Sequence, residues 1–151
     1  MEQSPRYLLI MACSQRKRPD PGLLPAIERY DGGSYRVLRK IKREGRWPDN
    51  LDVLILSAKY GLIEASTPIA DYEQRMTRDR ANQLRFQVTQ TLQTYASPHK
   101  TYEEVYVDLG QDYRFAFENL EKMFDHSSIT YAKGRIGQRL ASLKYWLTEL
   151  R

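Results

Sequence analysis

The sequence predicts an α/β protein with a mostly parallel sheet of about four strands and helices on both faces. Two short apolar runs, residues 7–12 and 51–56, each end abruptly in a polar turn, as strands buried in a parallel sheet do. Stretches with apolar residues at helical spacing separate these runs from two later candidate strands. Alternating strands and helices favour a sheet that is covered on both faces.

Composition places the chain among ordinary globular proteins. It has 151 residues, 41% hydrophobic and 28% charged, which suits one core, so we expect a single domain over 1–151. No apolar run approaches the roughly 20 residues that span a bilayer, and no cleavable signal is recognisable, so we expect a cytoplasmic protein without membrane contact. The single cysteine cannot form an internal disulfide.

The first half of the chain predicts a strand, loop, helix, strand unit. The strand over 7–12 is followed by a proline-containing loop, and Gly32-Gly33 precedes a helix near 34–44 for which Ser34 is a plausible N-cap. The run 51–56 is the next strand. A crossover of this kind is right-handed and packs its helix on the sheet.

The second half continues the alternation. The expected elements are a loop over 64–76, a helix that begins after the N-cap Thr77, a strand over 105–109, a helix over 113–124, a weak strand over 128–131 and a last helix over 136–150.

Positive charge is concentrated in the first third. Residues 1–50 hold 11 lysines and arginines against 6 acidic residues, and the net charge of the whole chain is +5. Arg36, Arg39, Lys40 and Arg43 lie on the helix within 34–46, where they are candidate contacts to nucleic-acid phosphates. The alternative is a solvated helix face.

Three candidate residues follow the first strand. Cys13 is a possible nucleophile that Lys17 could activate, although a small cysteine at a strand end is more often packed, which we favour. Ser14 and Lys17 could bind an oxyanion, the serine by donating a hydrogen bond and the lysine by its charge. The turn lacks the glycines of a phosphate-binding loop of the Walker A type.

A second polar cluster follows the strand over 51–56. It contains Ser57, Lys59, Tyr60 and Gly61, and a ligand site and a structural ion pair between Lys59 and a carboxylate are about equally good interpretations. Lys59 could pair with a phosphate or with a carboxylate from the loop that follows, and Tyr60 could stack on a base. Because the carboxyl ends of parallel strands share one edge of the sheet, we expect both clusters to line one crevice.

Carboxylates could reach the same crevice from two further segments. Asp71 could orient or deprotonate a substrate, and the adjacent Tyr72 could stack on a base. Asp108 and Asp112 flank the end of the third strand, where Asp112 is favoured as the N-cap of the next helix. His99 and His126 have no ligand-like spacing to each other or to the cysteine, so we expect neither a metal nor a cofactor.

The motif Cys13-Ser14-x-x-Lys17, the segment Leu56-Ser-Ala-Lys-Tyr-Gly-Leu62 and Asp71-Tyr72 resemble a family of small, largely uncharacterised bacterial and phage proteins. That family is distantly similar to YaaA-type peroxide-stress proteins, which are associated with DNA binding. It is also similar to the accessory domain of archaeal enzymes of the tRNA-guanine transglycosylase group. The resemblance implies a uracil-DNA-glycosylase-like or Rossmann-like three-layer sandwich. The archaeal domain carries a Pro-Cys-Ser-x-x-Lys segment in its functional region, and here Ala12 replaces the proline.

The leading hypothesis is a protein that acts on or binds a nucleobase, nucleotide or nucleic acid, with Cys13, Lys59 and Asp71 as the candidate catalytic residues. Whether it is an enzyme is left open. The alternative is a non-catalytic DNA- or RNA-binding module that uses the helix within 34–46, whose affinity would fall steeply with salt. A third hypothesis is a partner-binding protein that forms a homo-oligomer through the last helix.

Overall fold

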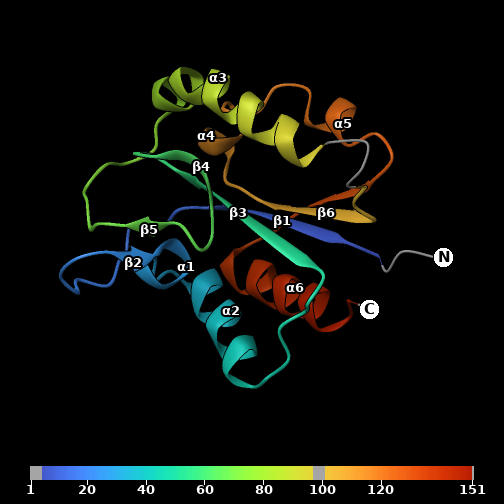
Figure 1. Cartoon of the computed structure of the whole chain (residues 1–151), viewed down its shortest axis with the longest axis horizontal. Helices are drawn as coiled ribbons and strands as arrows, with labels where there is room; N and C mark the ends of the chain where they lie inside the picture. Colours follow the sequence, from blue (N-terminus) through green and yellow to red (C-terminus); the bar gives the residue numbers. More distant parts are fainter. Residues whose placement is uncertain (1–4, 97–100, 151) are drawn as a thin grey trace.

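Figure 1 shows the fold in a computed structural model that describes residues 5–96 and 101–150. In chain order the elements are β1 (Tyr7–Ala12), β2 (Leu24–Pro25), α1 (Ala26–Arg29), α2 (Gly33–Arg43), β3 (Leu51–Ser57), β4 (Gly61–Glu64), β5 (Pro68–Ile69), α3 (Arg78–Tyr95), β6 (Glu104–Asp108), α4 (Gln111–Arg114), α5 (Leu120–Met123), β7 (Ser128–Tyr131) and α6 (Ile136–Thr148).

The core is a five-stranded sheet in the order β4-β3-β1-β6-β7. The strands β1, β3, β6 and β7 run parallel, which confirms the predicted mostly parallel sheet, whereas β4 is antiparallel to β3. In Figure 1 α3, α4 and α5 lie on one face of the sheet and α1, α2 and α6 on the other, so the sandwich has the three expected layers.

The first strand occupies the centre of the sheet. Met11 pairs with Ile55 of β3 on one side and with Asp108 of β6 on the other. Residues 7–11 are all buried, because both faces of this strand are covered by helices. The end of β1 therefore lies between the ends of its two parallel neighbours.

The edge strand β4 was not predicted, and one sequence expectation for this region was wrong. Residues 61–64 form β4 as the return strand of a tight hairpin in which Ser57 pairs with Gly61. The expected loop over 64–76 is interrupted by β5, whose Ile69 pairs with Leu24 of β2. β5 has only two residues, too few for an alternating pattern, and Gly61 hides the start of β4 by interrupting the apolar run.

The expected helix over 113–124 was also wrong. Two short helices, α4 and α5, occupy this region, and Asn119 between them adopts a left-handed conformation with φ of 57° that an α-helix cannot contain. The N-cap of α4 is Gly110, so Asp112 lies in the first turn and is not the cap that we expected.

Of the two N-caps predicted for the longer helices α3 and α2, one is confirmed and one is wrong. Thr77 caps α3 as predicted, because its Oγ1 accepts a hydrogen bond of 3.1 Å from the amide of Arg80. Ser34 is not the cap of α2, which begins at Gly33 after the N-cap Gly32. The Ser34 hydroxyl instead donates to Oδ2 of Asp108 at 3.2 Å and so links α2 to the end of β6.

A buried arginine holds the loop that follows β1. Arg29 is fully buried, and its guanidinium donates to the carbonyl oxygens of Arg18, Asp20 and Gly22 at 2.6–2.8 Å and to that of Ile69 at 3.3 Å. These four bonds come from the two terminal nitrogens, while Nε is buried without a partner, and they fix the loop against β5, which limits the movement of the residues just after the first strand.

No helix among the described residues is long and apolar enough to cross a bilayer.

Candidate functional site

A cavity of about 630 Å³ lies beyond the carboxyl end of β1. It is lined by Cys13, Ser14, Gln15, Lys17, Glu73, Gln74, Arg75, Met76 and Tyr113. Three of these had been predicted from the first strand end. The segment 73–76 and Tyr113 of α4 were not assigned a role, because residues that reach a site from a loop and a short helix leave no periodic signal in the sequence.

Two lysines from different strand ends lie near the ring of Tyr72, and one of them, Lys17, also lines this cavity. The Nζ atom of Lys17 lies 4.4 Å from the ring centre of Tyr72, and that of Lys59 lies 5.8 Å from the same ring. The backbone of Lys17 forms an isolated antiparallel β-bridge with that of Tyr30, and its ammonium donates a 3.2 Å hydrogen bond to the carbonyl of Gln15. The ends of β1 and β3 thus each place a lysine near the Tyr72 ring, while a single crevice lined by both clusters stays a prediction.

These lysines have no acidic partner within the described part of the chain. The ion pair considered between Lys59 and Asp71 does not form. Asp71 is exposed, and its Oδ1 accepts a hydrogen bond of 3.0 Å from the amide of Tyr72. Two ammonium groups against one ring, without a carboxylate within salt-bridge distance, give this end of the sheet a positive potential.

Tyr72 is the centre of a buried hydroxyl cluster. Its hydroxyl lies 2.7 Å from that of Tyr30 and 3.0 Å from Oγ of Ser57. Burial raises the pKa of Tyr30 to about 12 and raises that of Tyr72 still further, so both are neutral at physiological pH. Each ring has a lysine near it, Lys17 at Tyr72 and Lys59 at 5.3 Å from the centre of Tyr60. Tyr72 is only 8% exposed and Tyr60 is half-buried, so Tyr60 has the more accessible ring for a base.

The turn after β3 is shaped by side-chain bonds to its backbone. Oγ of Ser57 accepts from the amides of Lys59 and Tyr60 at 3.2 and 3.0 Å. On the outside, Arg80 of α3 donates to the carbonyls of Ala58 and Lys59 at 2.7 and 3.0 Å. Ser57 therefore builds the turn that presents Lys59 and Tyr60, and it does so while it is fully buried.

Gly61 ends this turn in a conformation that requires glycine. Its φ is +79°, and a Cβ atom placed on it would lie 2.3 Å from Oε1 of Gln87. The Gln87 amide needs that space, since it pairs with both the N–H and the carbonyl of Leu62, at 2.8 and 3.1 Å. Gly61 was predicted as a ligand residue, and the contacts described for it are structural.

The three candidate catalytic residues are not joined by any described contact. Cys13 is buried, and its Sγ lies 3.4 Å from the hydroxyl of Tyr113, whose pKa is raised by burial. A thiol is activated by a nearby cation or base, and a neutral phenol is neither. This environment agrees with the packed cysteine that the sequence favoured, while Lys59 and Asp71 lie at the turn and the loop described above.

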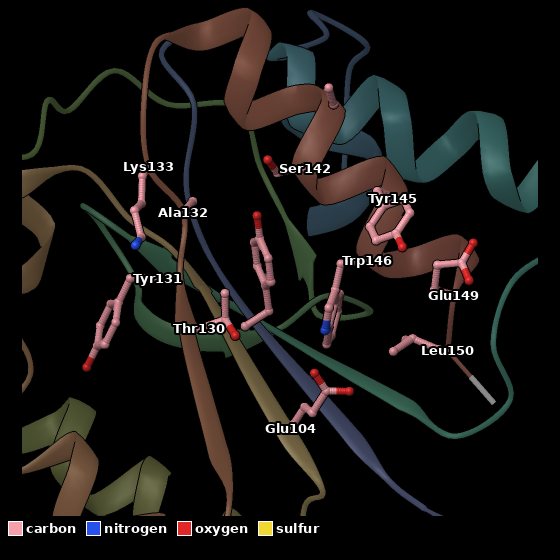
Figure 2. Close-up of a pocket in the computed structure, with 12 residues that line it drawn as sticks. Glu104, Thr130, Tyr131, Ala132, Lys133, Ser142, Tyr145, Trp146, Glu149 and Leu150 are labelled. Carbon is pink, nitrogen blue, oxygen red and sulfur yellow. The ribbon is translucent and has the colours of Figure 1, made fainter.

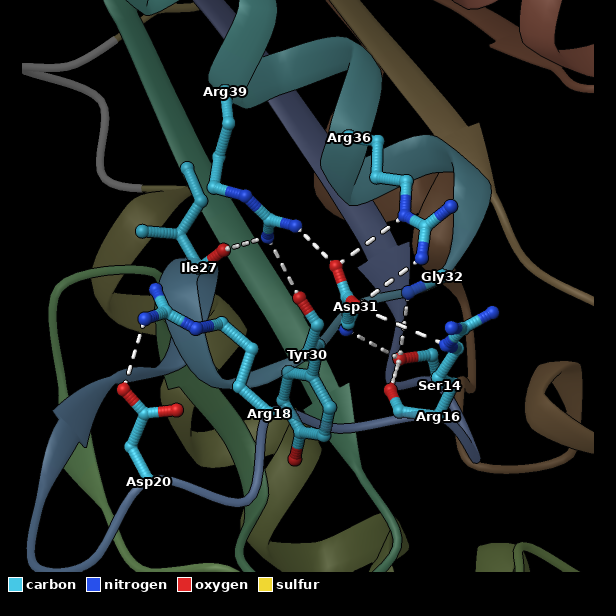
Figure 3. A network of polar contacts seen from close by, with 10 residues as sticks. All are labelled: Ser14, Arg16, Arg18, Asp20, Ile27, Tyr30, Asp31, Gly32, Arg36 and Arg39. Atoms are coloured by element: carbon cyan, nitrogen blue, oxygen red, sulfur yellow. Dashed lines mark hydrogen bonds and ion pairs between the residues drawn. The ribbon is translucent and has the colours of Figure 1, made fainter.

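Ser14 contributes to the start of α2 (Figure 3). Its hydroxyl donates to the carbonyl of Arg16 at 2.6 Å and accepts from the amides of Asp31 and Gly32, both at 3.2 Å. Because the hydroxyl hydrogen is used, Ser14 would have to release Arg16 to donate to an anion.

Asp31 gathers three arginines at the same end of α2 (Figure 3). Its carboxylate pairs with Arg39, with Arg36 at 3.2 Å and with Arg16 at 3.8 Å. The hydrogen bond and charge of Arg36, together with those of Arg39, lower the pKa of the Asp31 carboxyl despite its partial burial. Arg39 also donates to the carbonyls of residues 27 and 30, at 3.0 and 2.8 Å.

The candidate nucleic-acid residues of α2 therefore divide into two pairs. Arg36 and Arg39 are engaged by Asp31, and the Arg39 side chain is only 19% exposed. Lys40 and Arg43 are exposed and form no ion pair with any residue in 5–96 or 101–150. Within that same described part, no three His, Cys, Asp or Glu side chains gather as metal ligands would, and His99 lies outside it.

Comparison with protein families gives one match. The model of DUF6884, a family of unknown function, matches residues 8–145. The chain belongs to this family. The DUF6884 match extends from β1 into α6 and includes both lysines at the strand ends. Comparison with curated proteins finds no match.

Proposed function

We propose that the crevice at the ends of β1 and β3 binds a phosphate-bearing ligand, a nucleotide or a terminus of a nucleic acid, with Lys17 and Lys59 as its phosphate contacts. The observation that carries the proposal is that both ammonium groups lie near the Tyr72 ring, 4.4 and 5.8 Å from its centre, without a carboxylate partner in the described part of the chain. An anion bound at these lysines would supply the missing counter-charge.

The surroundings favour a nucleotide over a bare anion. The adjoining cavity of about 630 Å³ has the size of ordinary small-molecule sites, and its wall carries the cations Lys17 and Arg75 against one carboxylate, Glu73. The partly exposed ring of Tyr60 offers a surface for a base. The resemblance to YaaA-type proteins and to the archaeal accessory domain points to the same ligand class. A chemical step would add Cys13 as nucleophile and Asp71 as base, which is the hypothesis of an enzyme.

The alternative of a DNA- or RNA-binding module now rests on Lys40 and Arg43, since Asp31 engages the two other basic residues of that helix. Such binding would be sequence-independent and strongly dependent on salt.

The shift in melting temperature caused by AMP, adenosine, inorganic phosphate and a short single-stranded DNA distinguishes the nucleotide crevice from the nucleic-acid-binding helix. AMP at about 100 times its dissociation constant adds about 2.7 kcal/mol to the free energy of unfolding, a shift of a few degrees. We expect Lys17→Ala and Lys59→Ala each to abolish this shift. The matched control is the double variant Lys40→Ala/Arg43→Ala, which removes two cations of α2 and should leave the AMP shift intact.

A response to DNA alone, lost in the α2 double variant and kept in both lysine variants, would overturn the crevice proposal in favour of the helix. An AMP shift matched by adenosine would show that the phosphate is not what the lysines recognise.

A further inference from the structure

A second cavity, of about 650 Å³, lies on the opposite side of β6 from the central strand, between the sheet edge and α6 (Figure 2). Glu104 and Tyr106 of β6 and Thr130 of β7 contribute one wall, and Tyr145 and Trp146 of α6 contribute the other. None of these residues belongs to the crevice at the strand ends, so this groove is a separate place on the molecule.

The groove contains an unused hydrogen-bond donor. Trp146 is only 9% exposed, and its indole Nε1 is buried without a hydrogen-bond partner. Figure 2 shows this nitrogen turned towards the part of the groove where Thr130 and Glu104 lie. Buried indole N–H groups usually have an acceptor, so an unpartnered one beside a cavity is a donor that the acceptor of a bound molecule would satisfy.

The charge of the groove is opposite to that of the chain. Glu104 and Glu149 line it together with one cation, Lys133, whereas the protein as a whole has a net charge of +5. Neither glutamate forms an ion pair with a residue of the described ranges. Their carboxylates are therefore available to a positively charged ligand.

The aromatic surface suits the same ligand. The rings of Tyr106 and Trp146 pack with their centres 5.0 Å apart, and Tyr145 beside them is 69% exposed. Aromatic faces attract cations, and the attraction is stronger where water is partly excluded. Two free carboxylates next to an aromatic wall form the combination that recognises organic ammonium groups.

We propose that this groove binds an organic amine in its protonated form, with the ammonium at Glu104, an apolar or aromatic body against Tyr106 and Trp146, and a neighbouring hydrogen-bond acceptor on Trp146 Nε1. The site is independent of the anion crevice, and each proposal can fail without the other.

Three probes of similar shape and different charge test it: tyramine, which is cationic, 4-hydroxyphenethyl alcohol, which is neutral, and 4-hydroxyphenylacetate, which is anionic. The chain has two tryptophans, so the indole region of a ¹H–¹⁵N spectrum holds two signals, and Trp47→Phe identifies that of Trp146. We expect tyramine to shift the Trp146 signal saturably, to leave that of Trp47 in place, and to bind more tightly than the two other probes.

Glu104→Gln should weaken tyramine binding by about tenfold, the loss of one charged hydrogen bond. The matched control is Glu103→Gln, because this neighbour is exposed and is not among the residues that line the groove. Equal affinities for the three probes, an unmoved Trp146 signal, or equal effects of the two glutamine variants would each overturn the proposal.

Discussion

Gly61 and Gly45 both have a positive φ, of +79° and +72°, but their surroundings differ. A Cβ atom on Gly61 would meet the Gln87 amide, while one on Gly45 would meet nothing within 4 Å. Substitution of Gly45 therefore tests only the cost of the left-handed backbone, whereas substitution of Gly61 tests that cost together with a steric clash.

Gly61→Ala should lower the free energy of unfolding by about 2–4 kcal/mol, because it adds a clash with the Gln87 side chain to the strain of the left-handed backbone. Gly45→Ala should cost about 1 kcal/mol, for the backbone alone. Urea denaturation of both variants checks this. Equal losses would show that the Gln87 side chain moves aside at no cost.

Ser14, Ser57 and Gly61 explain why a site is harder to predict than a fold. Each stands at a strand end and has the residue type of a phosphate site, yet the described contacts of all three are internal. The sequence signal of a structural turn and that of a ligand site are the same. Only the hydrogen-bond partners distinguish them: Ser14 bonds to residue 16 and Ser57 to residue 60 within their own turns, and the space at Gly61 is taken by Gln87, 26 residues further along the chain.

At the scale of elements, the hydrophobic pattern was sufficient to predict the position of most helices and strands that are long or fully buried. The strands β1, β3, β6 and β7 and the helices α2, α3 and α6 were expected within a few residues of where they lie. The hairpin strand β4 was missed because Gly61 breaks the apolar run that it continues. The helix pair α4 and α5 was joined in error, because the apolar spacing from Tyr113 to Phe124 persists through the left-handed Asn119.

Asp31 joins α2 to the loop after β1, and its pairs have a defined dependence on pH. Since the pKa of its carboxyl is lowered in the folded protein, the stabilisation is present above the unfolded value of about 3.9 and is lost as pH falls through the folded value. Asp31→Asn should therefore lower the free energy of unfolding by about 1–2 kcal/mol at pH 7, and the difference from the unaltered protein should shrink below pH 4.

Asp20→Asn is the control for this prediction. The ion pair of Asp20 with Arg18 spans 2.9 Å, but both side chains are about 40% exposed, so its loss should cost under about 0.5 kcal/mol. Denaturation of the two variants at pH 7 and below pH 4 gives the comparison. A constant effect of Asp31→Asn across this range would mean that its charge is not what holds α2.

At the scale of the whole molecule, the sheet order predicts how stability is distributed. Residues 8–10 are fully buried in a strand with parallel neighbours on both sides, whereas β4 and β7 lie at the two edges. In native-state hydrogen exchange the amides of β1 should exchange only through global unfolding, and those of β4 and β7 through smaller openings. Exchange of β1 amides at a lower free energy than that of β7 would contradict the central role of this strand.

The strand order of the sheet also places the two cavities in different parts of the fold. The crevice lies where β1 and β3 end, next to α2 and the hydroxyl cluster of Tyr72, and the groove lies on the far side of β6. A positively charged site and a site with an excess of carboxylates are thus carried by one small sheet without facing each other.

The central position of β1 has a consequence for the order in which the chain is synthesised. β1 leaves the ribosome first and can pair with β3 as soon as residues 51–57 follow, but its other edge waits for residues 104–108. During that interval an apolar strand would present unpaired backbone groups to its surroundings, the condition under which chains pair with one another. We therefore expect nascent chains that stop after α3 to need chaperones, and chains that include β6 to be released as folded protein.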